Sequence, residues 1–191
     1  MKGRPVPTAA DGYAGSVGRE ITLRRYEERD HTAVRQLFVD VNRELATPEL
    51  RTAFEQYTAR SLREEIDRIP QYYGERGGSF WVVELSDGTL VGMFGIESAG
   101  GGAAELRRMY VAAHLRRRGV ARAMLEQAER VCSGEGWDRI VLSTSELQQP
   151  ALALYQAAGY RLIREETATA QTNKTVGGRL RRYHFKKPLG C

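Results

Sequence analysis

The segment Arg116-Arg117-Arg118-Gly119-Val120-Ala121 has residue types and an order that suit a phosphorylated ligand. A strand is predicted to end at Val111 and a helix to begin at Val120, so the segment forms the turn between them. Backbone N–H groups at a helix N-terminus have no partner within the helix, and the helix dipole adds positive charge there. Gly119 and Ala121 leave the backbone accessible, and the arginines add hydrogen-bond donors. The turn therefore predicts a pyrophosphate site, although a solvated basic loop would have the same composition.

Gln148 and Tyr155 form a second group of candidate residues, further along the chain. Gln148 lies just before a predicted helix at 150–158, and Tyr155 lies within that helix. A tyrosine hydroxyl has an ordinary pKa of about 10, so at neutral pH it can donate a hydrogen bond or a proton to a leaving thiolate. The alternative is an aromatic side chain packed on a helix face, which Leu152 and Leu154 beside it would support.

Both segments resemble motifs of the GNAT N-acetyltransferases. Residues 111–121 are similar to motif A, a strand valine followed by Arg/Gln-x-x-Gly-x-Gly/Ala, and Arg116, Gly119 and Ala121 occupy its signature positions. Residues 142–160 look like motif B, in which a strand leads into Asn-x-x-Ala-x-x-Leu-Tyr-x-x-x-Gly-Phe. The residues that match motif B in register are Ala151, Leu154, Tyr155 and Gly159. Two ordered motifs are more specific than either one alone.

The chain departs from both motifs in a few positions. Arg117 stands where the family often has Gly, and Ala113 stands where it often has Pro, but neither change removes a phosphate-binding amide. Gln148 replaces the commoner Asn, so a hydrogen bond to a pantetheine amide is less secure, and Tyr160 replaces Phe. The core from 80 to 185 is most similar to the camello-type or small-molecule branch of the family.

The resemblance implies a fold, a cosubstrate and a set of site residues. The fold would be α/β, with one mixed central sheet of about seven strands, splayed at the acetyl-CoA site and flanked by about four helices. Tyr155 would be the proton donor near the coenzyme sulfur. The residues implied to bind acetyl-CoA are Met109, Tyr110, Val111, Arg116, Arg117, Arg118, Gly119, Val120, Ala121, Arg122, Gln148 and Tyr155.

The implied reaction is the direct transfer of an acetyl group to a primary amine of a small molecule or peptide, in a ternary complex. Because an amine is mostly an ammonium ion at neutral pH, such an enzyme must take up a proton. Glu105 is the first candidate base, since histone-acetylating members of the family have a general-base Glu at the same spacing before motif A. Strand alternation predicts that Glu105 shares a face with Arg107, Met109 and Val111.

Alternatives remain open for the base, the acceptor and the function. Glu105 could instead be a surface residue paired with Arg107 or Arg108, and Glu97 or a chain of waters could take the proton. Arg107, Arg108 and Arg179 could attract an acceptor that carries a carboxylate. The alternative function is a non-catalytic sensor of acyl-CoA, or a scaffold, with the same fold.

Elements around these residues alternate between strands and helices. Strands are predicted at 21–24, 80–85, 90–96, 104–111, 140–144, 160–164 and 182–186. Helices are predicted at 31–45, from about 47 to 69 before Pro70, at 120–133 and at 150–158, with loops at 72–78 and 165–180. This order indicates a mixed α/β class around one sheet.

Composition sets wider limits. With 191 residues, 41% hydrophobic and 28% charged, the chain predicts one acetyltransferase domain at 21–191 after a flexible leader at 1–20. No apolar run has membrane-spanning length, and Cys132 and Cys191 lack metal-ligand spacing, so we expect no membrane, no metal and a cytoplasmic location. The net charge of +5 comes without interleaved aromatic residues, which disfavours nucleic acid. The sequence leaves open whether the protein forms a homodimer.

Overall fold

Within residues 21–190, which the computed structural model describes, seven strands form one sheet; the expected leader at 1–20 lies outside these residues. The strand order is β1-β2-β3-β4-β5-β7-β6, and only the β4–β5 pair is parallel. This arrangement confirms the predicted mixed α/β sheet. The strands are β1 Ile21–Arg25, β2 Ser79–Leu85, β3 Leu90–Gly100, β4 Ala103–Val111, β5 Arg139–Ser145, β6 Arg161–Ala168 and β7 Leu180–Pro188.

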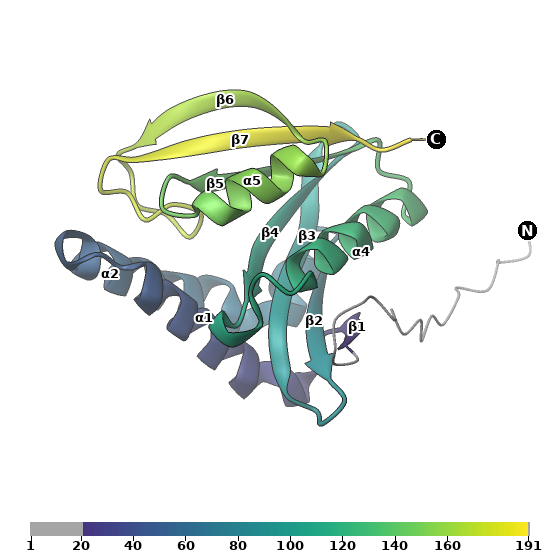
Figure 1. Ribbon diagram of the computed structural model, residues 1–191, viewed down its shortest axis with the longest axis horizontal. Coiled ribbons are helices and arrows are strands. Elements are labelled where there is room, and N and C mark those ends of the chain that lie inside the picture. The colour runs from purple at the N-terminus through teal and green to yellow at the C-terminus, as the bar shows by residue number, and fades with distance from the viewer. Residues whose placement is uncertain (1–20, 191) are drawn as a thin grey trace, which may run out of the picture.

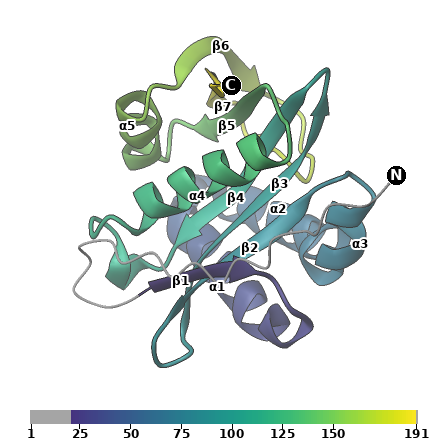
Figure 2. The same ribbon diagram turned by 90° about the vertical axis from the view of Figure 1, so that its right-hand side faces the viewer.

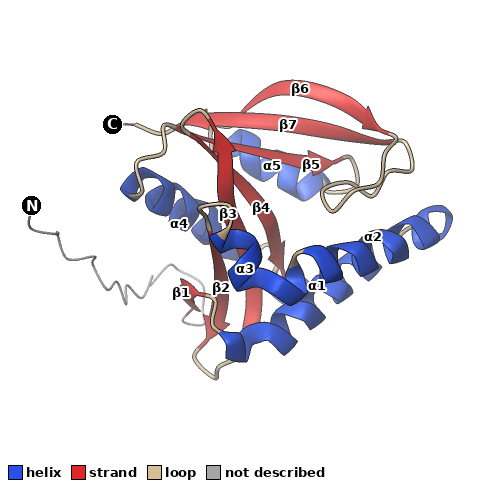
Figure 3. Ribbon diagram, turned by 180° about the vertical axis from the view of Figure 1, so that it is seen from behind, coloured by secondary structure: helices blue, strands red, loops and turns tan. Residues whose placement is uncertain are grey.

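Helices cover both faces of the sheet (Figures 2 and 3). On one face lie α1, α2 and the short α3, and on the other lie α4 and α5. Their bounds are α1 His31–Leu45, α2 Arg51–Glu64, α3 Ile69–Gly74, α4 Val120–Gly134 and α5 Gln149–Ala157. Each face has its own core, because apolar side chains recur every three or four residues along α1 and along α4.

The sheet divides where β4 and β5 stop pairing. The two strands pair only where Ala103–Leu106 of β4 lie beside Arg139–Leu142 of β5. Beyond this point β4 continues toward α1, whereas β5 stays beside β7, so an opening forms between them (Figure 1). Backbone groups that a neighbouring strand would occupy are thereby left for a ligand at the splayed edge.

A β-bulge in β4 lies at this opening. Arg108 and Met109 of β4 oppose the single residue Phe94 of β3, and Arg108 has a φ of 52°, in the left-handed region. The bulge makes the predicted alternation wrong beyond Arg107. Arg107 and Arg108 both contact Glu65 on the α1–α3 side, whereas Met109 packs against the core beneath α4. Glu105 and Met109 therefore lie on opposite faces of the strand.

Two predicted loops are partly regular structure. Pro70 does not end a helix but lies in the first turn of α3, where its missing N–H costs nothing, and Tyr72 and Tyr73 are helical and buried. Gly95 allows this, because a Cβ there would stand 2.2 Å from the Tyr73 hydroxyl. The last hairpin is also longer than predicted, since β6 runs to Ala168. None of the described helices is both long and apolar enough to cross a membrane.

Candidate active site

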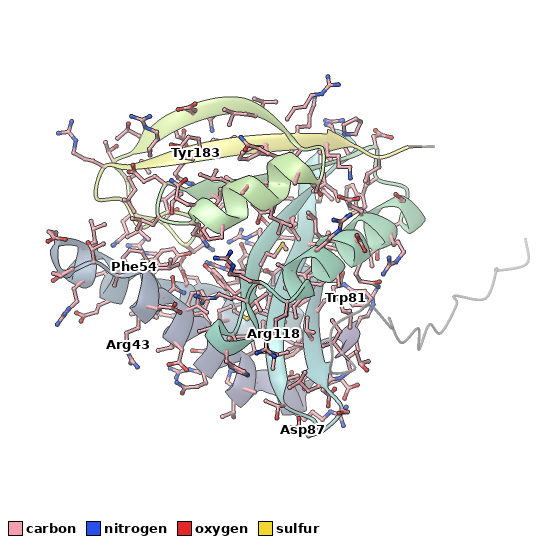
Figure 4. All side chains as sticks on the ribbon, in the orientation of Figure 1. Arg43, Phe54, Trp81, Asp87, Arg118 and Tyr183 are labelled. Carbon is pink, nitrogen blue, oxygen red and sulfur yellow. The ribbon has the colours of Figure 1, made fainter. Side chains whose placement is uncertain are left out.

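The basic turn between β4 and α4 presents the N-terminus of α4 to solvent. Gly119 is the N-cap with a φ of 83°, and Arg117 also has a positive φ, of 60°. No side chain caps α4, so the first amides of the helix are left for an external acceptor. Arg118 follows on the same turn, at the start of α4 (Figure 4). This geometry suits the oxygens of a pyrophosphate.

Arg116 stabilises the turn from within. Its Nε donates to the Val111 carbonyl at 3.1 Å, and Nη1 and Nη2 donate to the two Glu44 carboxylate oxygens at 2.6 and 2.8 Å. The bidentate contact ties the C-terminal turn of α1 to the start of the basic turn. The Arg116 guanidinium is thus held by protein groups, whereas Arg117 and Arg118 form no ion pair within residues 21–190.

A groove of about 580 Å³ extends from this turn into the opening between β4 and β5. Its floor comes from the end of β4, and its walls come from α1, the start of α4 and the β5–α5 segment. The groove is charged at the turn and apolar further in, which matches a ligand with a phosphate end and an extended apolar arm. It is lined by Val41, Glu44, Leu45, Met109, Tyr110, Val111, Arg116, Arg117, Gly119, Ala121, Arg122, Leu147, Gln148, Pro150, Ala151, Leu154 and Tyr155.

Tyr155 lies at the inner end of the groove. Its hydroxyl contacts the Met109 sulfur at 3.8 Å, and its ring packs between Tyr160 and Phe185, with centroids 5.9 Å away in each case. Burial raises the pKa of Tyr155, so the hydroxyl keeps its proton at neutral pH. Such a group is suited to donating a hydrogen bond to a thiolate.

A second, smaller cavity of about 110 Å³ lies on the α1–α2 side of β4, beneath the β6–β7 loop (residues 169–179). Phe54 projects into this region from α2 (Figure 4). Leu45, Tyr110 and Gln148 line both the cavity and the groove, so the two spaces meet at these residues. A ligand in the groove and a ligand in the cavity could therefore touch at the splay.

Lys174 on the β6–β7 loop holds both candidate bases. Its Nζ lies 2.6 Å from Glu105 Oε2 and 2.8 Å from Glu97 Oε1. Glu105 lines the cavity and is 21% exposed, whereas Glu97 is 4% exposed and does not line it. Burial alone would raise the pKa of Glu97, but the charges and hydrogen bonds of Arg107 and Lys174 outweigh it and hold that pKa below its usual value.

Beneath the cavity lies a buried ionic network centred on Glu65, which is fully buried. Its carboxylate accepts hydrogen bonds from Tyr73 Oη at 2.7 Å, Arg107 Nη2 at 2.7 Å, and Arg108 Nε and Nη2 at 3.0 and 2.6 Å. Arg108 Nη2 also donates to the carbonyl of Asn173, at 2.6 Å, so the network anchors the β6–β7 loop. The alternative considered for Glu105, a surface pair with Arg107 or Arg108, is not found, and Glu105 pairs with Lys174 instead.

Known proteins share this fold and these motifs. A sequence model of the Acetyltransferase (GNAT) family matches residues 38–160, which include the splayed strands, the basic turn and α5. The chain belongs to the GNAT acetyltransferase family. This membership agrees with the resemblance carried by the two motifs, and it accounts for the open sheet.

Individual GNAT relatives give further detail. N-acetyltransferase family 8 member 3 of Rattus norvegicus is 35% identical over 114 residues, which are 56% of this chain and 50% of that protein. The chain thus spans about half the length of such relatives. The uncharacterized N-acetyltransferase YjgM of Escherichia coli is 29% identical over 74% of this chain and 82% of its own.

Solved structures agree with the fold. A GCN5-related N-acetyltransferase from Kribbella flavida has a TM-score of 0.64 and 26% identity, covering 88% of this chain and 98% of its own. A phosphinothricin acetyltransferase from Sinorhizobium meliloti, solved in complex with AcCoA, has a TM-score of 0.65 and 18% identity, covering 89% of each chain.

Most residues that the GNAT motifs assign to the coenzyme line the groove. The exceptions are Arg118, which is exposed beside it, and Val120, whose side chain lies in the core and which could contribute only its backbone amide. Sequence reasoning missed Glu65 and Lys174. A signal for Glu65 existed, because two adjacent arginines in a strand of a sheet covered on both faces need a buried acidic partner.

Proposed function

We propose that this chain transfers the acetyl group of acetyl-CoA to a primary amine of a small molecule or peptide, by direct attack within a ternary complex. The observation that carries the proposal is the junction of the long groove with the polar cavity at the splay of β4 and β5. We assign the acetyltransferase domain to residues 21–191. The N-acetyltransferase names of the rat and Escherichia coli relatives, and the AcCoA complex of the Sinorhizobium meliloti protein, support the same reaction.

The groove has the features that acetyl-CoA requires. The uncapped N-terminus of α4 and the Gly119 turn offer amides to the pyrophosphate, with Arg117 and Arg122 at the rim. The unpaired edge of β4 from Met109 to Val111 offers backbone groups to the pantetheine arm, and Gln148 offers a side-chain amide from the other wall. Bound there, acetyl-CoA supplies an activated acyl group on a thiol leaving group.

On the acceptor side, Glu105 takes the proton that the attacking ammonium must lose. Glu105 is favoured over Glu97 because it lines the cavity and keeps part of its surface exposed, whereas Glu97 is nearly enclosed and held by Arg107. The acceptor nitrogen forms a bond with the thioester carbonyl carbon, the carbon–sulfur bond breaks, and the proton passes to Glu105 or through it to water. Lys174 must release Glu105 for this step, so the acceptor amine competes with a lysine ammonium for the same carboxylate.

Two groups stabilise the charges that develop during the transfer. The backbone amide of Met109, at the β4 bulge, faces the developing oxyanion, whereas the Tyr110 amide points toward β3, as the Ala112 amide does two residues later. The Tyr155 hydroxyl donates to the departing thiolate. Because burial raises the pKa of Tyr155, a hydrogen bond is favoured over complete transfer of the proton. Neither step uses Cys132, the cysteine within residues 21–190, since it is buried and burial raises the pKa of its thiol to about 12.

A coupled thiol-release assay with acetyl-CoA tests the proposal directly. The panel should contain amino acids, polyamines, aminoglycosides and short peptides, with the acetylated product identified by mass spectrometry. We expect turnover with at least one class of amine and no turnover when the amine is omitted. Saturable binding of acetyl-CoA without turnover on any amine would instead support the acyl-CoA sensor.

A further inference from the structure

Arg182 on β7 faces the acceptor cavity with a neutral partner. Its Nη2 donates a hydrogen bond to Ser143 Oγ on the neighbouring strand β5, and both residues line the cavity. No carboxylate of residues 21–190 forms an ion pair with Arg182. Glu166 lies on the strand beside it, but its carboxylate is bound by His184 at 2.8 Å and Arg164 at 3.1 Å.

The charges around the cavity do not balance. Three carboxylates in and beneath it, Glu65, Glu97 and Glu105, are all engaged by cations other than Arg182. These contacts are Arg107–Glu65, Arg107–Glu97, Arg108–Glu65, Lys174–Glu97, Lys174–Glu105 and a longer Arg76–Glu97 pair, in which Arg76 is shared with Glu75. Arg182 adds a cation that has no carboxylate partner within residues 21–190, so its positive charge is uncompensated at the cavity wall.

The surroundings of Arg182 differ from those of the other enclosed arginines. Carboxylate partners raise the pKa values of Arg24, Arg107 and Arg108 despite their burial. For Arg182, burial dominates and the pKa is lowered, because the acidic groups around it are too distant to offset the loss of water. A partly desolvated guanidinium without a counter-ion favours the binding of an anion.

We propose that Arg182 and Ser143 bind the carboxylate of the acceptor, so that the substrates are small amines carrying a carboxylate, such as free amino acids. The guanidinium presents a fork of donors that matches a carboxylate. The Ser143 hydroxyl accepts from Arg182, so its own proton is available for the same anion. The small volume of the cavity, about 110 Å³, favours a compact acceptor. This inference rests on the proposed acetyl transfer and assigns its substrate class.

Arg107 and Arg108, the arginines that the sequence offered for this role, do not fit it. Their side chains are 5% and 4% exposed, and their donors are bound by Glu65, Glu97, Tyr57 and Asn173. Arg179, the third, does not line the cavity. The anion-binding role therefore moves to Arg182, which sequence reasoning did not single out.

The test compares matched acceptors on matched variants. An amino acid and its carboxamide are assayed for acetylation by the wild-type chain, by Arg182→Gln and by Arg181→Gln. Arg181 is the control because it is the adjacent arginine on β7, is 59% exposed and lies outside the cavity lining. Arg182→Gln should raise the KM of the acid about 10- to 100-fold, the range of a charge-assisted hydrogen bond, without changing the KM of the carboxamide or of acetyl-CoA. Arg181→Gln should retain the wild-type preference for the acid.

Equal use of acid and carboxamide by the wild type, or an unchanged preference in Arg182→Gln, would overturn the inference while leaving acetyl transfer intact. Failure of every amine would remove the proposed function, and a binding measurement then decides the inference on its own. An N-acetylated amino acid, titrated by calorimetry in the presence of CoA, should bind the wild type and bind Arg182→Gln at least about 10-fold more weakly. Should Arg182→Gln not fold, Arg182→Lys keeps the charge without the fork and should show a smaller change in the same direction.

Discussion

Replacing Glu65 by Gln should destabilise the chain strongly, because Glu65 neutralises two buried guanidinium groups. The substitution preserves the size of the side chain and removes only its charge. Arg107 would keep Glu97, and Arg108 would keep the Tyr57 hydroxyl and the Asn173 carbonyl, so the network is broken in part. Breaking a buried ion pair costs about 3–5 kcal/mol, and the remaining contacts place the expected loss in the free energy of unfolding near 3 kcal/mol.

The pH dependence gives a second signature. Burial alone would raise the pKa of Glu65, but the charges of Arg108 and Arg107 and their hydrogen bonds outweigh it, so the folded-state pKa is lowered. A carboxylate of this kind contributes stability that is fully present above its unfolded pKa of about 4.3 and is lost as the pH falls through the lower folded value. The difference in stability between wild type and Glu65→Gln should therefore be constant from about pH 7 to pH 5 and shrink below about pH 4.

Urea unfolding followed by circular dichroism measures both effects. With an m-value near 2 kcal/mol/M, a loss of about 3 kcal/mol moves the midpoint by about 1.5 M. Glu64→Gln is the matched control, because the neighbouring Glu64 side chain is 41% exposed and, within residues 21–190, forms a single ion pair, a long one of 3.7 Å to Arg63. Solvent screens this pair, so the free energy of unfolding should change by less than about 0.5 kcal/mol. A midpoint for Glu65→Gln equal to that of Glu64→Gln would refute the reasoning.

Three further predictions concern the proposed reaction. Tyr155→Phe should lower kcat by about 100-fold with little change in Tm, and an unchanged kcat would remove the proton-donor or thiolate-stabilising role. Gly119→Val should raise the KM for acetyl-CoA at least about 10-fold, because a branched side chain at a φ of 83° strains the turn. The control is Gly136→Val, just beyond the other end of α4, where φ is 82°; it should cost similar stability but leave the KM for acetyl-CoA unchanged. Equal effects of the two substitutions on this KM would contradict a phosphate site at Gly119. Lys174→Met should raise kcat/KM for the amine acceptor severalfold, because the acceptor ammonium no longer competes with Lys174 for the Glu105 carboxylate; an unchanged kcat/KM would contradict Glu105 as the base.

Local patterns predicted the basic turn and the helices beside it. The bounds of α1 follow from its apolar spacing, and the start of α4 follows from the change to helical periodicity at Val120 after a glycine. These features depend on interactions between residues that are close in the chain, where propensity and periodicity are informative. The two motifs also predicted a set of coenzyme-binding residues, and most of these residues line one groove.

Tertiary packing decided the face of each side chain in β4. Alternation from Glu105 onward failed because a bulge at Arg108 shifts the register, and a bulge depends on the partner strand rather than on the bulged strand alone. Pro70 entered a helix for a related reason, since the core around Tyr72 and Tyr73 stabilises a turn that the local sequence would not hold.

The partners of the charged side chains likewise follow only from the folded structure. Glu65 and Glu64 are indistinguishable in sequence, yet one is fully buried against two arginines and the other is exposed. Lys174 reaches Glu105 across 69 residues, and Arg182 remains without a carboxylate because β5, β6 and β7 place the available acids elsewhere. Electrostatic energy depends on distance in space and on burial, neither of which the order of residues supplies. The sequence by itself thus predicted the residues of the proposed coenzyme groove, whereas the proposed acceptor side depends on which long-range pairs the fold brings together.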